Sequence, residues 1–521
     1  MRELFIENWI LFALVLIAVI GLVLMLYVTD QGVSLGSDSA AYIAAAQNFL
    51  KGYGLSWVSA KLEVKPLVHY PPFYPIVLAG FELASINAID AARLVNTIAF
   101  GLGIFLIGLI IKIATGSNLL AIGGALLMLV SGEQIEIHSW GMSEPLFISL
   151  SLLGLTLLFL FLRDSNAIYL VLSAFVFGLV AITRYIGAVY IFATLTVLML
   201  DIRLEIRARL KNLLRFLIIS TLPLAFWMMR NFLAVGKVSN RTLGLNTVTL
   251  ERDFNVGFKS VLNWFLPLRI VEILQSRLIM AIGTTILVLI AILIIVAFLH
   301  FKAREDKDEM RIVPDPFTVL VIFALFFLLG LALSVLLTSP TPDISERILG
   351  PAYVLILMIV VLVIGAAIRT KKWIILLITI GLVVFLFRNK AVYTYWIVRD
   401  IHGGEGRFYT SRGWRNSPVI AELASYPDHL IYTDDIAAMY LLAGRYSSLI
   451  PIRIDLSTRL PNEDYLQTLA SVRDTVSSGE AIIVLFSPYS IAHEYVPLDD
   501  LIEGFEILYE SSNGMIVSAS P

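Results

Sequence analysis

Long runs of apolar residues recur through residues 8–388 and are separated by short polar segments. A run of about 20 apolar residues can cross the hydrocarbon core of a bilayer as a helix. We therefore predict about eleven transmembrane helices, at roughly 8–28, 90–113, 117–132, 144–162, 167–183, 185–201, 213–230, 275–300, 316–338, 348–368 and 372–388. The run at 73–83 is too short to cross, and it predicts a helix that lies at the interface or re-enters the membrane.

The pattern changes after about residue 388. Polar and charged residues return in 389–521, and the apolar runs shrink to the length of strands. The spacing predicts helices at 417–425, 436–442 and 465–476, strands at 429–433 and 481–486, and a hairpin formed by 505–510 and 515–518. We expect an α-helical transmembrane domain at 1–388, followed by a small α/β domain at 389–521.

The composition narrows the class of protein. Hydrophobic residues make up 58% of the 521 residues and charged residues only 15%, against about 25% in soluble domains. A soluble core could not hold so many apolar side chains, which excludes a soluble enzyme and a disordered chain. The formal net charge of −2 gives no basic surface for nucleic acid. Because cysteine is absent, disulfides and thiolate metal sites are excluded as well.

Basic residues gather in three short loops, within 203–215, 302–311 and 369–372. The positive-inside rule predicts that these loops lie in the cytoplasm. The N-terminus is then cytoplasmic, and the connections at about 29–72, 133–143 and 231–274 lie on the outer side with the α/β domain. We expect a multi-pass protein of the plasma (inner) membrane with an extracytoplasmic C-terminal domain.

The first outer connection holds two groups of candidate residues. Asp38 lies in the sequence S-D-S-A-A-Y, which ends at Tyr42, and a helix is predicted to begin there. His69 and Tyr70 open the sequence H-Y-P-P-F-Y-P, whose prolines give a rigid entry into the short apolar helix. Two simpler explanations stay open. Asp38 could cap its helix, and the aromatic residues could belong to an interfacial belt.

The other candidates stand where predicted transmembrane helices meet the outer side. Glu144 opens the fourth span beside Pro145, which is a good start for a helix but a costly place for a carboxylate. Four arginines lie at outer helix ends, where the positive-inside rule disfavours cations: Arg93, Arg184, Arg230 and Arg347. Since guanidinium pairs well with phosphate, they are candidates for binding a lipid phosphate. Pairing with a nearby acid, such as Glu346 beside Arg347, is the alternative.

Taken in order, these motifs resemble the GT-C glycosyltransferase superfamily. The order is S-D-S-A-A-Y, H-Y-P-P-F-Y-P, A-A-R-L-V-N, M-S-E-P-L-F and S-E-R-I-L-G-P-A-Y, over about residues 1–390. The sequence is most similar to the family-39 branch, whose relatives include protein O-mannosyltransferases and the aminoarabinose transferase of lipid A. The last motif departs from the family pattern at Ile348, where the family usually has tyrosine.

The resemblance implies an integral membrane glycosyltransferase that uses a polyprenyl-phosphate sugar on the outer side of the membrane. It implies that Asp38 is the general base for the acceptor, that Glu144 is a second catalytic acid, and that Arg347 lies near the donor phosphate. A single base gives one displacement, with inversion at the anomeric carbon. The other candidates complete the expected site, with Arg93, Arg184 and Arg230 as phosphate ligands and Tyr42, His69 and Tyr70 as substrate-binding residues. The acceptor would be a lipid, a glycan or a protein.

Two other functions stay open at this stage. The chain could be a transporter or flippase of lipid-linked sugars, or a non-enzymatic membrane assembly protein. Transporters often carry inverted repeats, and the sequence has no repeat of fixed period. No cofactor is expected, with one exception. A divalent cation such as Mg²⁺ or Mn²⁺ could bind to Asp38, Glu144 and His138, a set rich in oxygen ligands.

Overall fold

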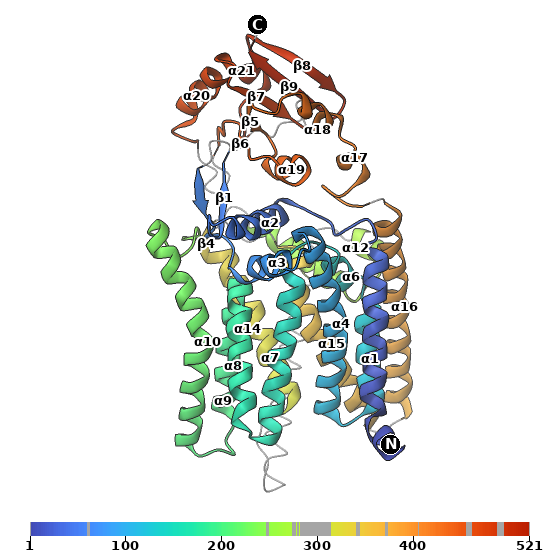
Figure 1. Cartoon of the computed structure of the whole chain (residues 1–521). Helices are drawn as coiled ribbons and strands as arrows, with labels where there is room; N and C mark the ends of the chain where they lie inside the picture. Colours follow the sequence, from blue (N-terminus) through green and yellow to red (C-terminus); the bar gives the residue numbers. More distant parts are fainter. Residues whose placement is uncertain are drawn as a thin grey trace.

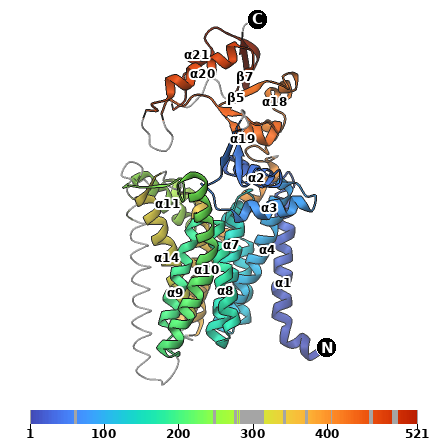
Figure 2. The same ribbon diagram turned by 60° about the vertical axis from the view of Figure 1, so that its left-hand side comes forward.

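A bundle of long helices carries a smaller α/β domain at one end (Figure 1). The computed structural model of the chain describes residues 2–59, 63–245, 250–273, 278, 281, 314–339, 344–369, 373–404, 406–454, 461–486 and 494–519. The N-terminus lies at the end of the bundle that is remote from the α/β domain (Figures 1 and 2). The two ends of the chain are therefore on opposite sides of the bundle.

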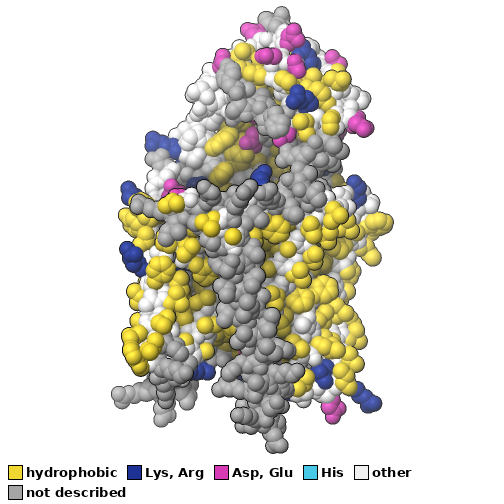
Figure 3. Space-filling view, turned by 180° about the vertical axis from the view of Figure 1, so that it is seen from behind, with side chains coloured by type: hydrophobic (Ala, Val, Ile, Leu, Met, Phe, Trp, Pro, Cys, Tyr) yellow, Lys and Arg dark blue, Asp and Glu magenta, His cyan; other side chains and the backbone are white. Residues whose placement is uncertain are grey.

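Seven of the described helices are long and apolar enough to cross a membrane. They are α1 (Arg2–Val28), α4 (Ala88–Thr115), α7 (Glu144–Asp164), α10 (Ile206–Val235), α14 (Pro316–Leu337), α15 (Glu346–Arg369) and α16 (Trp373–Gly403). Apolar side chains cover the outer face of the bundle, as Figure 3 shows for one side. A water-soluble protein does not expose such a surface, so the chain is a multi-pass membrane protein.

Three more predicted spans match helices that are bent or short. The predicted span 117–132 is a bent pair, α5 (Asn118–Leu129) and α6 (Gly132–His138), with 57° between the two helices. The predicted spans 167–183 and 185–201 are α8 (Ala167–Thr183) and α9 (Ala188–Leu200), joined by the 3-10 turn η1 (Tyr185–Gly187). The predicted span 275–300, apart from residues 278 and 281, lies outside the described residues.

The sharp turn between α8 and α9 depends on a glycine. Gly187 approaches α8 so closely that an added Cβ would lie 2.6 Å from the carbonyl oxygen of Val180. A larger residue would therefore push the two helices apart. The turn leaves Arg184 with an extended backbone directly after α8, which turns its side chain toward the interior of the bundle.

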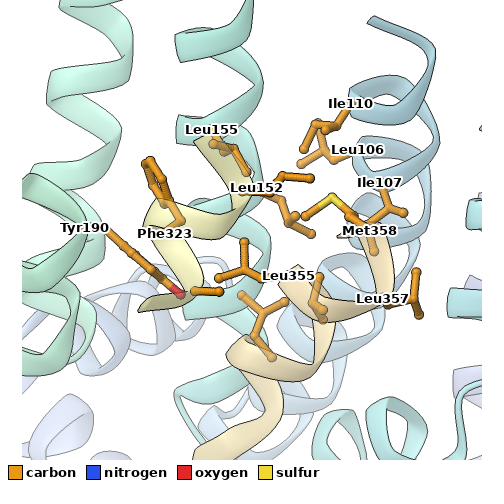
Figure 4. Close-up of a cluster of buried hydrophobic side chains, with 14 of the residues drawn as sticks. Leu106, Ile107, Ile110, Leu152, Leu155, Tyr190, Phe323, Leu355, Leu357 and Met358 are labelled. Atoms are coloured by element: carbon orange, nitrogen blue, oxygen red, sulfur yellow. The ribbon is translucent and has the colours of Figure 1, made fainter. Parts of the chain in front are cut away.

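Interlocking aliphatic and aromatic side chains form the core of the bundle (Figure 4). They come from five helices, α4, α7, α9, α14 and α15, and include Leu106, Ile107, Ile110, Leu152, Leu155, Tyr190, Phe323, Leu355, Leu357 and Met358. Lipid tails are as apolar as leucine, so close packing rather than escape from water holds such helices together. The core thereby fixes α7 and α15 relative to each other.

A layer built from the first outer connection lies between the bundle and the α/β domain (Figures 1 and 2). It contains α2 (Ser37–Leu50), the hairpin of β1 (Ser56–Val58) and β2 (Val64–Pro66), and α3 (Phe73–Leu83). Both helices lie across the end of the bundle. The sequence prediction of a short helix at 73–83 that does not cross the membrane is confirmed.

The α/β domain contains a five-stranded sheet in the order β6-β5-β7-β9-β8. The strands are β5 (Leu430–Thr433), β6 (Ser448–Leu449), β7 (Ala481–Leu485), β8 (Phe505–Ser511) and β9 (Gly514–Ala519). The first three are parallel, whereas β8 and β9 form the predicted antiparallel hairpin.

Helices and turns cover the sheet and connect it to the bundle. They are α17 (Arg412–Arg415), α18 (Pro418–Glu422), η2 (Leu423–Ser425), α19 (Ile436–Ala438), the π-turn η3 (Met439–Ala443), α20 (Tyr465–Ser477) and α21 (Leu498–Ile502). One face of the sheet packs on α20 and the other on α18, so each face has its own apolar core. The prediction of a small α/β unit is confirmed, and β6, α17 and α21 are additions to it.

The predicted boundary at residue 388 falls inside α16, which continues to Gly403. The apolar run stops before this point, but the helix continues because its polar residues find partners on the bent pair. Lys390 pairs with Glu133 of α6, and the hydroxyl of Thr394 donates to the carbonyl oxygen of Val130 at 2.6 Å. Hydropathy alone therefore places the end of this helix too early.

We expect the α/β domain to lie on the extracytoplasmic side of the membrane and the basic loop between α9 and α10 to lie in the cytoplasm. Because the natural chain has no cysteine, a single introduced cysteine is a unique chemical label. Ser512→Cys, in the exposed β8–β9 turn, should react with a membrane-impermeant maleimide in intact cells. Glu205→Cys, in the basic loop, should react only after the cells are permeabilised. The reverse pattern would contradict this topology.

Candidate active site

A cavity of about 780 Å³ lies at the end of the bundle that carries α2. Its wall combines residues from α2, α7, α9, α10, α14 and α15 with residues from the connections around 69–71 and 238–243. Its polar part contains seven of the nine residues predicted from sequence and one charged residue that was not predicted. These are Asp38, Tyr42, His69, Tyr70, Glu144, Arg184 and Arg347, with Arg241 as the addition.

Asp38 stands on the first turn of α2, but it does not cap the helix. The N-cap residue is Gly36, whose backbone N–H donates to the hydroxyl of Ser39 at 3.1 Å. The Asp38 carboxylate points to other partners. Its Oδ1 accepts a hydrogen bond from the Tyr70 hydroxyl at 2.6 Å, and its Oδ2 lies 3.3 Å from both terminal nitrogens of Arg347. The side chain is 33% exposed, so the carboxylate remains open to the cavity.

Glu144 is the first residue of α7 and is almost completely buried. Its Oε1 lies 2.8 Å from Nη1 of Arg184 and 3.2 Å from Nε of Arg347. Neither carboxylate oxygen accepts a hydrogen bond of normal geometry from a described residue. The two guanidinium charges therefore offset the cost of burying this carboxylate, and Arg347 connects it to Asp38.

Two tyrosines hold neutral hydroxyl groups beside the acids. Burial raises the pKa of the Tyr42 hydroxyl well above its usual value, and its oxygen lies 3.1 Å from the hydroxyl of Ser143. Burial, together with the charge of Asp38, raises the pKa of Tyr70 even further. Both side chains therefore keep their protons at neutral pH, and Tyr70 remains a donor to Asp38.

His69 completes this side of the cavity as a neutral group. Its Nδ1 lies 2.8 Å from Oδ1 of Asn240, and its ring meets the Tyr70 ring edge to face at a centroid distance of 4.4 Å. Burial lowers the pKa of His69 below its ordinary value, and the charge of Arg241 acts in the same direction. The imidazole is therefore uncharged at neutral pH and can exchange hydrogen bonds with a ligand.

Arg241 is the cation that sequence analysis missed. It directly precedes β3 (Thr242–Leu243), which pairs with β4 (Thr338–Ser339) at the end of α14, and its Nη1 donates to the hydroxyl of Ser334 at 3.2 Å. Burial lowers the pKa of Arg241, and the nearby charge of Arg184 adds to this effect. It lies in a predicted outer connection without a recognisable motif, so only the β3–β4 pairing reveals its place.

The cavity has an uneven charge balance. Three arginines face two carboxylates across it, and the histidine is neutral, so the lining carries one excess positive charge. Most of the remaining wall is apolar and includes Ile186, Val189, Leu224, Met228, Phe327 and Leu331, from η1, α9, α10 and α14. A ligand that fits this cavity joins an anionic group to an apolar chain.

Two of the predicted phosphate ligands lie elsewhere. Arg93 donates to the hydroxyl of Thr29 at 3.2 Å and to the carbonyl oxygen of Leu26 at 2.9 Å, so it ties α4 to α1. Arg230 donates to the carbonyl oxygens of Leu55 and Leu67 at 3.2 Å each, and so supports the β1–β2 hairpin. Neither lines the cavity, because backbone carbonyl groups of α1 and of the β1–β2 hairpin accept hydrogen bonds from these guanidinium groups.

The predicted set of metal ligands is not assembled. His138 is buried inside the bundle, with its Nδ1 2.7 Å from the carbonyl oxygen of Gln134 and its ring against Phe100. It does not line the cavity, whereas Asp38 and Glu144 do. In the part of the chain that the structure describes, no three histidine or acidic residues form a group that could hold a metal ion.

Comparisons of sequence give no relative: no family model and no curated protein matches this chain. Comparisons of structure do. The chain is similar to ArnT from Cupriavidus metallidurans in the apo state, with a TM-score of 0.52 and 14% identity over 97% of this chain and 98% of that chain.

Two larger proteins share the same architecture. The archaeal oligosaccharyltransferase AglB from Archaeoglobus fulgidus has a TM-score of 0.52 at 12% identity, over 99% of this chain and 75% of that chain. The arabinofuranosyltransferase AftD from Mycobacteria has a TM-score of 0.53 at 14% identity, over 98% of this chain but 41% of that chain. These neighbours are GT-C glycosyltransferases, and the chain shares their fold.

We expect the cavity to bind a lipid phosphate such as farnesyl phosphate, which joins an anion to an isoprenoid chain. Arg241→Gln should weaken this binding by about 10- to 100-fold, because a hydrogen bond to a charged group contributes about 1.5–3 kcal/mol. Titration of the purified protein in detergent, followed by thermal shift, gives the affinity. Arg93→Gln is the matched control and should bind as the unaltered protein does. Equal losses in both variants would contradict an anion site at Arg241.

Proposed function

We propose that the protein is an integral membrane glycosyltransferase, which moves a sugar from a polyprenyl-phosphate donor to an acceptor on the extracytoplasmic side. One observation carries this proposal. A carboxylate that is open to the cavity and three arginines line the polar half of one space whose other half is apolar. The GT-C fold agrees with this chemistry, and a neighbour of the same fold, AglB, binds a dolichol-phosphate and an inhibitory peptide.

The charge balance supports a monophosphate donor. A polyprenyl-phosphate sugar is a phosphodiester with one negative charge, which equals the excess positive charge of the lining. Arg184, Arg241 and Arg347 would contact its phosphate, since one guanidinium group can donate two parallel hydrogen bonds to phosphate oxygens. The first isoprene units would lie along the apolar wall between α9, α10 and α14.

Asp38 is the proposed general base. Its carboxylate accepts the proton of the acceptor hydroxyl while that oxygen forms its bond to the anomeric carbon. The bond between this carbon and the phosphate oxygen breaks, and the lipid phosphate leaves with the electron pair. The arginines stabilise the negative charge that develops on it. Because one displacement occurs, the configuration at the anomeric carbon is inverted.

Glu144 has a different role in this scheme. It is buried and lies between Arg184 and Arg347, so it cannot approach the acceptor as freely as Asp38 does. We assign it to holding both guanidinium groups at the position of the donor phosphate. Tyr70 orients Asp38 by donating to Oδ1, and Tyr42 and His69 offer hydrogen bonds to the sugar or the acceptor. The acceptor is a lipid, a glycan or a protein, delivered from the outer side.

The direct test is transfer in vitro. The purified protein in liposomes is mixed with a panel of radiolabelled polyprenyl-phosphate sugars and with extracts that contain candidate acceptors. Transfer of label from the lipid supports the proposal, and the anomeric configuration of the product tests inversion. Movement of an intact labelled donor across the bilayer without transfer would instead show a flippase. Absence of both activities would favour an assembly role.

Asp38→Asn separates catalysis from structure. Asparagine keeps the size of the side chain and can still accept from Tyr70, but it cannot take a proton. We expect kcat to fall about 10²- to 10⁴-fold, the usual contribution of a general base, with little change in donor affinity. The measurement is steady-state transfer together with lipid-phosphate binding. Near-normal activity in this variant, with Glu144→Gln inactive, would move the base to Glu144.

Transfer should not depend on a divalent cation. In the cavity, the guanidinium of Arg347 already lies between Asp38 and Glu144 and would repel a metal ion that approached the two acids. Activity should therefore be unchanged after dialysis against a chelator and should not rise when Mg²⁺ or Mn²⁺ is added. Loss of activity in chelator that either ion restores would show that the protein needs a metal.

A further inference from the structure

Helix α2 carries Asp38 and Tyr42, but it is not one of the helices of the bundle. It lies across the end of the bundle, under the α/β domain (Figure 2). The charged groups linked to Asp38, by contrast, stand on bundle helices: Arg347 on α15 and, through it, Glu144 on α7. The distance between the base and these groups therefore depends on what holds α2 in place.

The last turn of α2 is held by the α/β domain. Gln47 donates to Oε1 of Glu82 at 3.1 Å, and its own Oε1 accepts from the hydroxyl of Tyr440 at 2.5 Å. The next residue, Asn48, is fully buried; its Nδ2 donates to the carbonyl oxygen of Ser56 at 3.0 Å, and its Oδ1 accepts from the hydroxyl of Tyr446 at 2.8 Å. The side-chain amides of Gln47 and Asn48 thus each link another part of the outer layer to the α/β domain.

The segment that enters α2 is held from the same side. The backbone N–H of Tyr409 donates to the carbonyl oxygen of Leu35 at 3.3 Å, and the hydroxyl of Thr410 donates to that of Val33 at 3.0 Å. Tyr409 is itself fixed to the domain, because its hydroxyl lies 2.8 and 2.7 Å from the two carboxylate oxygens of Asp435, to which it donates. The C-terminal part of the chain therefore forms hydrogen bonds with the segment before α2 and with the last turn of α2.

We infer that the α/β domain sets the position of Asp38 through α2, with Tyr440 and Tyr446 as positioning residues. The inference rests on the proposed role of Asp38 as the base. Both tyrosines lie on the segment that follows β5, and their rings stack on each other at a centroid distance of 5.9 Å. They act as one unit on neighbouring amides of α2. A displacement of about 1 Å at a reacting group can lower the rate about 10²-fold. The hydrogen bonds from the two tyrosines to α2 should therefore affect kcat.

The kinetic test uses the double variant Tyr440→Phe/Tyr446→Phe in the full chain. It removes two hydroxyl groups and keeps both rings in place. We expect kcat to fall about 10- to 100-fold while the KM for the lipid donor stays the same, because the arginines that bind the donor are on other elements. Tyr465→Phe, in α20 of the same domain, is the matched control and should not change kcat.

A double-mutant cycle shows whether the effect passes through the base. In an Asp38→Asn background, the two tyrosine changes should produce little further loss of turnover, since the group that they position no longer accepts a proton. A full additional loss in that background, or a loss that appears in KM alone, would overturn the inference.

A spectroscopic test does not depend on activity. The chain has no cysteine, so Leu50→Cys on α2 and Leu233→Cys on α10, both exposed, can carry a pair of spin labels. Pulsed electron resonance should give a narrow distance distribution in the unaltered background and a broader one with the two tyrosine changes. An unchanged distribution would overturn the inference. If the two tyrosine changes broaden the distribution but the unaltered protein has no transferase activity, the α/β domain does position α2, and the proposed function is refuted.

Discussion

The ion pairs of Arg347 are the interaction on which the site depends. This residue stands on the first turn of α15 and contacts Asp38 of α2 and Glu144 of α7. Its ion pairs therefore join three separate parts of the chain. Removing one partner from a buried pair costs about 3–5 kcal/mol, because a charge is left without compensation in a medium of low polarity. The bundle core therefore has to hold α7 and α15 in register, and the outer layer has to bring Asp38 to the same guanidinium.

Much of this architecture could be predicted from sequence. Apolar runs of bilayer length gave the helices of the bundle, and the change in run length gave the α/β domain with its hairpin. The ordered motifs gave Asp38, Glu144 and Arg347, which the structure brings into one cavity. The predictions of the helices and of the α/β domain are confirmed because they rest on hydropathy, which is a strong local signal.

Other features could not be predicted, because they depend on the direction in which a side chain at a helix end points and on contacts between segments far apart in the chain. Arg93 and Arg184 both stand at outer helix ends, yet only Arg184 faces the cavity, since its side chain follows the turn at Gly187. Arg241 reaches the site through the pairing of β3 with β4, two segments far apart in the chain. The tyrosines that bind α2 come from the α/β domain, where no motif links them to residues 47 and 48. A single sequence does not contain the geometry that decides these contacts.

The charges around Glu144 explain why a carboxylate is buried at this position. Without Glu144, the guanidinium groups of Arg184 and Arg347 would lie close together with only Asp38 to offset them, and they would repel each other and Arg241. With Glu144 in place, one excess positive charge remains, which balances the single negative charge of a phosphodiester. The same carboxylate thus holds the cations together and limits the charge that the cavity offers.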